Sequence, residues 1–140
     1  DAQQARLIEQ MARDLFLSVR VRRGATVRER DGLAMSSRNA YLDARERSSA
    51  AALPRGLVAA RAALERGARS ASRVTGAVRR VWRAEPRVRE DYVAVVDANT
   101  LEPVRRVSGR VLVAVAARIG RARLIDNFEW QPRGRRGGRR

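Results

Sequence analysis

The sequence predicts an α+β fold in which helices pack on a small antiparallel sheet. Three observations indicate this class: several helical apolar patterns come first, the composition becomes β-rich at Asp91, and the β-rich runs follow one another closely. The three runs, separated by turn-forming residues, cover residues 92–96, 110–117 and 123–128. Several helices followed by three neighbouring strands favour a helix-covered sheet.

Residues 2–15 are predicted to form an amphipathic helix, because their apolar residues recur at helical spacing. Its apolar side carries Leu7, Ile8, Met11 and Leu15. Asp1 lies at the N-cap position, where a carboxylate stabilises the free N–H groups. Val19 and Val21 alternate with polar residues and predict a short strand that ends near Gly24.

The middle of the chain is predicted to hold two helices joined by a break. A stretch rich in Ala, Leu and Arg begins after Asp43, a predicted N-cap, and contains Pro54. Proline breaks or kinks a continuous helix but is favoured at the first helical position. We therefore expect the second helix to cover residues 54–66, closed by Gly67.

One more helix is predicted before the strands. Ser70 or Ser72 caps it, and it stops at Pro86. Its apolar side carries Val74, Val78, Val81 and Trp82. We assign Trp82, and Met11 of the first helix, to packing rather than to function.

The chain is expected to divide near residues 40–43, where a loop passes into the Ala-rich helices. Residues 1–42 then form a first part, and residues 43–131 form a small α+β domain. Residues 132–140 read Pro-Arg-Gly-Arg-Arg-Gly-Gly-Arg-Arg and predict a disordered Arg/Gly tail, because they have nothing to bury.

The composition excludes several kinds of chemistry. The 140 residues include 31 basic and 15 acidic side chains, which gives a formal net charge of +16. Every basic residue is arginine, and the sequence has neither histidine nor cysteine. Zinc fingers, Ser-His-Asp and Cys–His catalytic sites and disulfide frameworks are therefore excluded.

The positive charge invites a nucleic-acid interpretation, because clustered arginine neutralises phosphates. Much of the charge, however, lies in the tail or is spread over helical faces, and few aromatic side chains accompany it. Nucleic acid is thus not the expected partner, but an arginine-rich module that binds polyanions stays open as an alternative function.

The sequence shows no sign of a membrane span or a signal peptide. No apolar run approaches the ~20 residues that a membrane-spanning helix needs. The first residues include neither an initiator methionine nor the apolar region of a signal peptide. We therefore expect a chain cut from a longer protein.

Residues 31–39, Asp-Gly-Leu-Ala-Met-Ser-Ser-Arg-Asn, are predicted to form a loop that suits a polyanion. The hydroxyls of Ser36 and Ser37 and the nearby backbone N–H groups can donate to phosphate oxygens. The guanidinium of Arg38 adds a bidentate, charge-assisted pair, and Gly32 allows the loop to close over a nucleotide. Taken as a tripeptide alone, Ser-Ser-Arg is more often a solvated turn.

The sequence around this loop resembles the pantoate–β-alanine ligase (pantothenate synthetase) family. The resemblance rests on residues 26–29, on residues 31–39, which match the family's signature loop, and on Tyr41-Leu42. That loop is the counterpart of the lysine-containing loop of class I aminoacyl-tRNA synthetases. Further matching segments lie at residues 1–4, 91–93, 96–97, 100–101, 118–120 and 123–127. The resemblance covers nearly all of residues 1–130 in order.

The resemblance implies an AMP-forming acid–amine ligase. In this family the carboxylate of pantoate attacks the α-phosphate of Mg-ATP, giving pantoyl adenylate and pyrophosphate. The amine of β-alanine then attacks the adenylate and releases pantothenate and AMP. The resemblance also implies a cytoplasmic homodimer, with Mg²⁺ arriving on ATP rather than on a protein ligand. Residues 1–42 would be the last helix and strand of a Rossmann-like ATP-binding domain.

The resemblance assigns the phosphates of ATP to the centre of the loop. Ser36, Ser37 and Arg38 would hold them and neutralise the leaving pyrophosphate, as the catalytic residues. Met35 would contact the adenosine through its backbone. No side chain needs to act as a nucleophile, so catalysis would rest on positioning and on stabilising phosphate charge.

The remaining implied contacts lie before the loop. Val27 would offer backbone hydrogen bonds to adenine, Asp1 would bind the ribose hydroxyls, and Gln4 would bind pantoate. Each has a simpler interpretation, respectively as a strand residue, a helix cap and a solvated helix position.

The sequence departs from the family pattern by absence. A His-containing motif for ATP phosphates and a Lys just before the position of Asp1 are both missing. Ala2 replaces a usual aromatic residue and Ala25 a usual proline. The chain therefore corresponds to the C-terminal half of the family's enzymes, and we expect it to be inactive or very weak alone.

Overall fold

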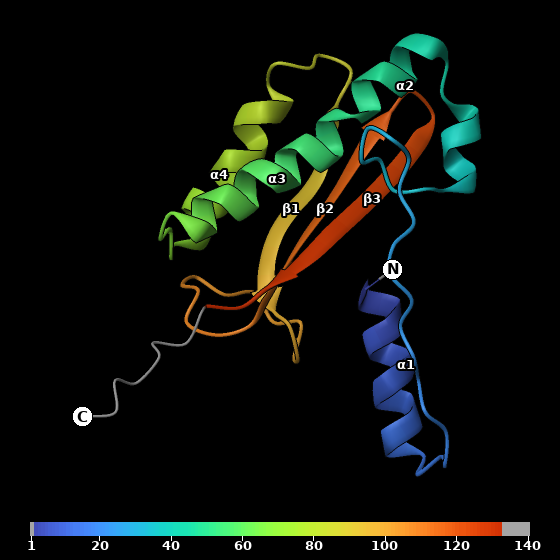
Figure 1. The fold of residues 1–140 in the computed structure, drawn as a ribbon, viewed down its shortest axis with the longest axis vertical. Coiled ribbons are helices and arrows are strands. Elements are labelled where there is room, and N and C mark those ends of the chain that lie inside the picture. Colours follow the sequence, from blue (N-terminus) through green and yellow to red (C-terminus); the bar gives the residue numbers. More distant parts are fainter. Residues whose placement is uncertain (1, 133–140) are drawn as a thin grey trace.

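The protein is a three-stranded antiparallel sheet with helices on one face (Figure 1). The structure, a computed structural model, describes residues 2–132; Asp1 and residues 133–140 of the predicted 132–140 tail lie outside them. Its helices are α1 (Ala2–Asp14), α2 (Ala44–Ala50), α3 (Ala52–Glu65), α4 (Ala71–Trp82) and the 3₁₀ helix η1 (Ser37–Tyr41). Its strands are β1 (Arg89–Asp97), β2 (Val111–Ile119) and β3 (Ala122–Trp130). The predicted α+β class and three antiparallel strands are confirmed.

The sheet has the order β1-β2-β3, so β2 is the central strand. Val115 of β2 pairs with Val93 of β1 on one side and with Asp126 of β3 on the other. The β2–β3 hairpin turns through Gly120, whose φ of +54° favours glycine. Strands rich in β-branched residues suit such a half-buried surface.

Helices α3 and α4 cover one face of the sheet and form the core with it (Figure 1). The largest fully buried side chains come from the helices, the sheet and the β1–β2 connection: Leu53, Leu64, Val74, Val78, Val107, Val113, Val115 and Ile119. Trp82 is buried, as predicted, and its indole N–H donates to the Ala52 carbonyl at 3.0 Å. This bond satisfies the polar end of a large apolar side chain.

The helix break near Pro54 comes slightly earlier than predicted. Asp43 and Glu46 form a capping box at the start of α2, and α3 begins at Ala52 rather than at Pro54. Pro54 nevertheless lies in the first turn of α3, where the missing N–H has no intrahelical partner to lose. Gly67, with a φ of +95°, follows the helix as expected.

Two predictions for the N-terminal part are wrong. Residues 17–27 contain no strand, although Val19 and Val21 alternate with polar residues, because no strand within residues 2–132 pairs with them. Met11 does not pack; 52% of it is exposed, and Ala12 is the only buried residue of α1. The reason is that α1 projects away from the sheet (Figure 1).

Replacing Gly56 by alanine is expected to lower the free energy of unfolding by about 1–3 kcal/mol, as overpacked cores do. Gly56 allows α3 to lie close to α4, because a Cβ there would lie 2.8 Å from Trp82 Nε1 and 2.9 Å from Val78 Cγ1. Gly76 is the matched control, because a Cβ there meets nothing within 4 Å. Gly76→Ala in α4 should instead stabilise by about 0.5–1 kcal/mol. Urea unfolding of both variants checks this, and equal effects would contradict it.

Candidate functional site

The loop at residues 31–39, called the signature loop below, borders a pocket of about 430 Å³ against β3. The lining comes from α1, the signature loop and one end of the strand. Among the residues that the sequence singles out, it includes Gln4, Met35, Ser36 and Arg38. The structure thus brings together side chains that are more than thirty positions apart in the chain.

The base of the signature loop is a tight turn. Glu29 N–H donates to the Leu33 carbonyl at 2.8 Å, and Gly32 N–H donates to the Glu29 carbonyl at 2.9 Å. Gly32 adopts a φ of +87°, which a residue with a Cβ rarely adopts. Leu33 is only 2% exposed and inserts into the core. The turn is therefore anchored by apolar burial as well as by backbone bonds.

Arg28 fastens this turn to the sheet. Its guanidinium donates to both carboxylate oxygens of Asp126 on β3, at 2.7 and 2.9 Å, and to the Gly32 carbonyl at 2.9 Å. The Asp126 side chain is only 2% exposed. The hydrogen bonds to Asp126 and the attraction between the two charges raise the pKa of Arg28. A bidentate Arg–carboxylate pair fixes orientation as well as distance.

Arg47 of α2 holds the other side of the turn. It donates to Asp31 at 2.6 Å and to Glu29 at 2.7 Å. Asn39 donates to Glu29 at 2.9 Å and to the Ala34 carbonyl at 3.1 Å. The hydrogen bonds from Arg47 lower the pKa of both carboxyl groups. The signature loop thus has a fixed base on the sheet and α2.

The tip of the signature loop, in contrast, is open. Met35 is 61% exposed, and Ser36, Ser37 and Arg38 are exposed as well. Ser36 is the N-cap of η1, and its hydroxyl oxygen accepts from the Arg38 N–H at 3.2 Å. Its O–H can still donate to a ligand. An exposed tip on a fixed base is a suitable arrangement for binding a charged ligand.

Two predicted site residues within residues 2–132 do not line the pocket. Ser37 and Val27 lie outside its lining, although the Val27 carbonyl accepts from Met35 N–H at 2.9 Å. Asp1 lies outside the described residues. The pocket also includes residues of β3 that the sequence indicated only as strand positions, among them Arg123, Asp126 and Asn127. Polar residues inside an otherwise apolar strand are the signal that could have identified them.

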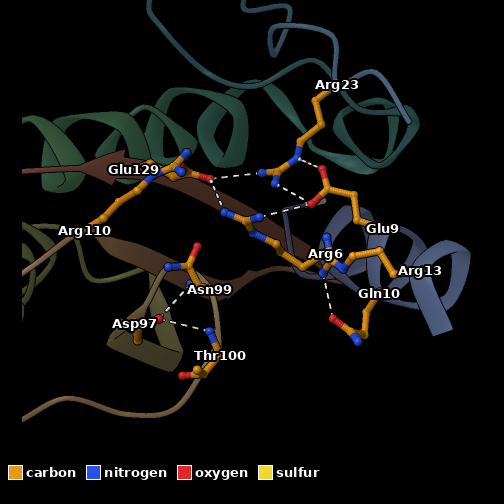
Figure 2. A network of polar contacts seen from close by, with 10 residues as sticks. All are labelled: Arg6, Glu9, Gln10, Arg13, Arg23, Asp97, Asn99, Thr100, Arg110 and Glu129. Atoms are coloured by element: carbon orange, nitrogen blue, oxygen red, sulfur yellow. Dashed lines mark hydrogen bonds and ion pairs between the residues drawn. The ribbon is translucent and has the colours of Figure 1, made fainter. Parts of the chain in front are cut away.

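A network of ion pairs fastens α1, and with it Gln4, to the sheet (Figure 2). Glu9 accepts from Arg23 at 2.6 and 2.9 Å and from Arg6 at 3.1 Å. Glu129 of β3 accepts from Arg23 at 3.0 Å and from Arg110. Hydrogen bonding to Arg23 lowers the pKa of Glu9. Polar contacts rather than apolar burial therefore set the position of α1.

Replacing Arg47 by glutamine is expected to remove stability that depends on pH. In the folded state the pKa values of Glu29 and Asp31 lie below their ordinary values of 4.5 and 3.8. The stability that Arg47 contributes through these carboxylates is therefore fully present at pH values above those ordinary pKa values. It is lost as the pH falls through the lowered values. The difference in the free energy of unfolding between the unaltered chain and Arg47→Gln should therefore be largest near neutral pH and shrink toward about pH 3.

The matched control for this series is Arg45→Gln, because Arg45 is exposed on the same helix. Urea unfolding at several pH values should show no pH-dependent difference for Arg45→Gln. A difference for Arg47→Gln that stays constant with pH would contradict the role of the two carboxylates.

Residues 2–132 contain neither a membrane-spanning helix nor a cluster of metal-ligating side chains. No helix in that range is long and apolar enough to cross a membrane. The same residues contain no group of three or more acidic side chains placed to hold a metal ion.

Comparison with known proteins identifies related sequences and folds. The sequence model of the pantoate–β-alanine ligase family matches residues 1–129. The pantothenate synthetase of Rubrobacter xylanophilus is 51% identical over 128 residues, covering 91% of this chain and 44% of that protein. That of Nitratidesulfovibrio vulgaris (strain Miyazaki F) is 49% identical over 129 residues, covering 91% of this chain and 46% of that protein.

The fold agrees with these sequence matches. The crystal structure of pantothenate synthetase from Thermus thermophilus superimposes with a TM-score of 0.87 at 42% identity. It covers 93% of this chain, which in turn covers 47% of that structure. The chain thus spans about half the length of the curated relatives it matches. With a family match over nearly its whole length, the chain belongs to the pantoate–β-alanine ligase family.

Proposed function

We propose that this chain supplies the phosphate-binding loop and the adjoining sheet of a pantoate–β-alanine ligase. The observation that carries the proposal is the pocket in which Ser36 and Arg38, on a loop with a fixed base, meet Gln4 of α1. Its polar lining and exposed guanidinium suit a phosphorylated ligand. In this proposal the chain is divided as the sequence predicts. Residues 1–42 are the end of a nucleotide-binding domain, and residues 43–131 form the domain that follows it.

The proposed reaction has two steps. An oxygen of the pantoate carboxylate attacks the α-phosphorus of ATP, the bond to the bridging oxygen breaks, and pyrophosphate leaves. The amine of β-alanine then attacks the carbonyl carbon of pantoyl adenylate, loses a proton, and displaces AMP. Because the substrates provide both nucleophiles, the chain needs neither histidine nor cysteine for the chemistry.

Each site residue has a role in this proposal. Arg38, Ser36 and Ser37 stabilise the negative charge that grows on the leaving pyrophosphate. Met35 contacts the adenosine, and Gln4 binds pantoate. Val27 and Asp1 complete the nucleotide site at adenine and ribose, respectively. Mg²⁺ would arrive bound to the phosphates, where it neutralises charge.

We also propose that ligase activity requires a second polypeptide segment, because the chain spans about half the length of its relatives. Alone, it should form AMP very slowly or not at all. The active assembly is proposed to be a cytoplasmic homodimer of complete subunits, acting on pantoate, β-alanine and ATP.

A reconstitution experiment tests the proposal. The chain is mixed or co-expressed with the part of the Thermus thermophilus relative that it does not match, and AMP is measured by chromatography. AMP formation should require both segments, pantoate and β-alanine. An assembled pair that forms no AMP with all three substrates would refute the proposal.

The alternative of an arginine-rich module for polyanions has less support. Many described arginines are already paired with carboxylates, namely Arg6, Arg23, Arg28, Arg47, Arg55, Arg79 and Arg110. Paired guanidinium groups contribute little to a continuous positive surface. The comparisons give no preference to this alternative.

A further inference from the structure

Arg123 is a second arginine of the pocket, and it reaches the pocket from the sheet rather than from the signature loop. It lies near the start of β3 and lines the same space as Arg38 and Ser36. Its neighbours Leu124 and Asp126 are buried, whereas Arg123 is exposed. The alternation along the strand therefore turns this side chain away from the core.

The guanidinium of Arg123 is held at one edge. Its Nε donates to a carboxylate oxygen of Asp91 at 2.6 Å, and its central carbon lies 5.9 Å from the centre of the Tyr92 ring. Within residues 2–132, its hydrogen bonding involves only Nε, so both terminal nitrogens stay available. A guanidinium fixed at Nε presents its terminal nitrogens as a preorganised fork for an anion.

The charge balance of the pocket also favours an anion. Asp126 is the acidic residue of the lining, and Arg28 neutralises it through two hydrogen bonds. No carboxylate of the lining pairs with Arg38. Asp91, which accepts a hydrogen bond from Arg123, is not part of the lining. Among residues 2–132, the lining thus contains two arginines, Arg38 and Arg123, and its single carboxylate is already paired with Arg28. A diphosphate group, with several charged oxygens, suits two such donors better than one.

We propose that Arg123 is a second phosphate-binding residue, which contacts the diphosphate part of the ligand from the sheet while Arg38 contacts it from the signature loop. The inference rests on the proposed function and deepens it. A diphosphate held by both residues would link the loop to β3, because its oxygens are shared by side chains from two elements. Asp91 and Tyr92 are then positioning residues for Arg123.

Titration of the 140-residue chain with inorganic pyrophosphate, followed by calorimetry, tests this role. Arg123→Gln should weaken binding about 10- to 100-fold, as expected for a lost charge-assisted hydrogen bond. Arg123→Lys, which retains the charge but not the fork, should show an intermediate loss. Arg118→Gln is the matched control, because Arg118 is the exposed cross-strand partner of Arg123 and does not line the pocket. It should bind as the unaltered chain does.

The outcomes separate this inference from the function on which it rests. If Arg38→Gln weakens binding but Arg123→Gln does not, the role of Arg123 is overturned. The proposed phosphate-binding role of the signature loop then still stands. If the unaltered chain, shown to be folded by circular dichroism, binds no pyrophosphate, the role of Arg123 is overturned, while AMP formation by the reconstituted assembly still tests the proposed function separately. Equal losses in Arg123→Gln and Arg118→Gln would indicate a general charge effect and would also overturn the inference.

Discussion

Replacing Arg38 by alanine is expected to slow AMP formation by the reconstituted ligase about 10²–10³-fold, as the loss of one preorganised donor does in other active sites. The side chain lines the pocket from the exposed tip of the signature loop. In the proposed first step, negative charge grows on the oxygen that leaves with pyrophosphate. A guanidinium already placed there stabilises this charge without rearrangement, and alanine cannot.

The control for Arg38→Ala is Arg106→Ala, since Arg106 is an exposed arginine outside the pocket lining. Initial rates of AMP release, measured at saturating pantoate and β-alanine, should be unchanged in this control. Circular dichroism should show that both variants fold. A rate for Arg38→Ala within about twofold of the unaltered assembly would exclude the proposed role of Arg38.

Replacing Arg28 by alanine is expected to lower the free energy of unfolding by about 3 kcal/mol, because it leaves a buried carboxylate without its partner. Asp126 is buried on β3, and Arg28 supplies two of its hydrogen bonds. The same change also removes the bond to the Gly32 carbonyl. The base of the signature loop should therefore loosen together with the loss of stability.

A second substitution separates buried charge from lost packing. Asp126→Asn introduced into Arg28→Ala removes the unpaired charge, so the double variant should regain part of the stability. Urea unfolding measures all variants, and hydrogen exchange at the Met35 amide, which is bonded to the Val27 carbonyl, reports on the loop base. If Arg28→Ala lowers the free energy of unfolding by less than about 1 kcal/mol, the Arg28–Asp126 pair contributes no more than an ordinary surface ion pair, which would contradict the prediction.

Local sequence patterns predict most of the secondary structure because they act over a few residues. The Asp43 cap, the closing Gly67 and the buried Trp82 all agree with the structure. The three strands also occur at the expected positions, although β2 begins one residue later than predicted and the strands otherwise extend one to three residues past the predicted ends. Caps, turns and alternation are local signals, so a single sequence carries them.

The errors concern residues whose state depends on distant partners. Met11 lies on an apolar helix face, but α1 meets the body of the protein through ion pairs, so the face stays exposed. Val19 and Val21 alternate as strand residues do, yet a strand needs a neighbour for its hydrogen bonds. Periodicity reports that a face could be buried, not that a partner covers it.

The candidate site was predicted only in part. The signature loop could be identified from its residues, whereas its fastening could not, because Arg28 and Asp126 are 98 positions apart. The place of Arg123 in the pocket follows from the β2–β3 hairpin and from the approach of the loop to β3. Such long-range pairings arise from packing, and no local pattern encodes them.

The proposed function makes this chain part of an enzyme that joins pantoate to β-alanine through an adenylate. The most direct test supplies the reconstituted assembly with pantoate whose carboxylate is labelled with heavy oxygen, and then analyses AMP by mass spectrometry. Attack of the carboxylate on the α-phosphorus, followed by attack of the amine on the carbonyl, leaves one carboxylate oxygen on the phosphate. We predict AMP that carries a single labelled oxygen. Unlabelled AMP, or label found only in released phosphate, would contradict an adenylate intermediate.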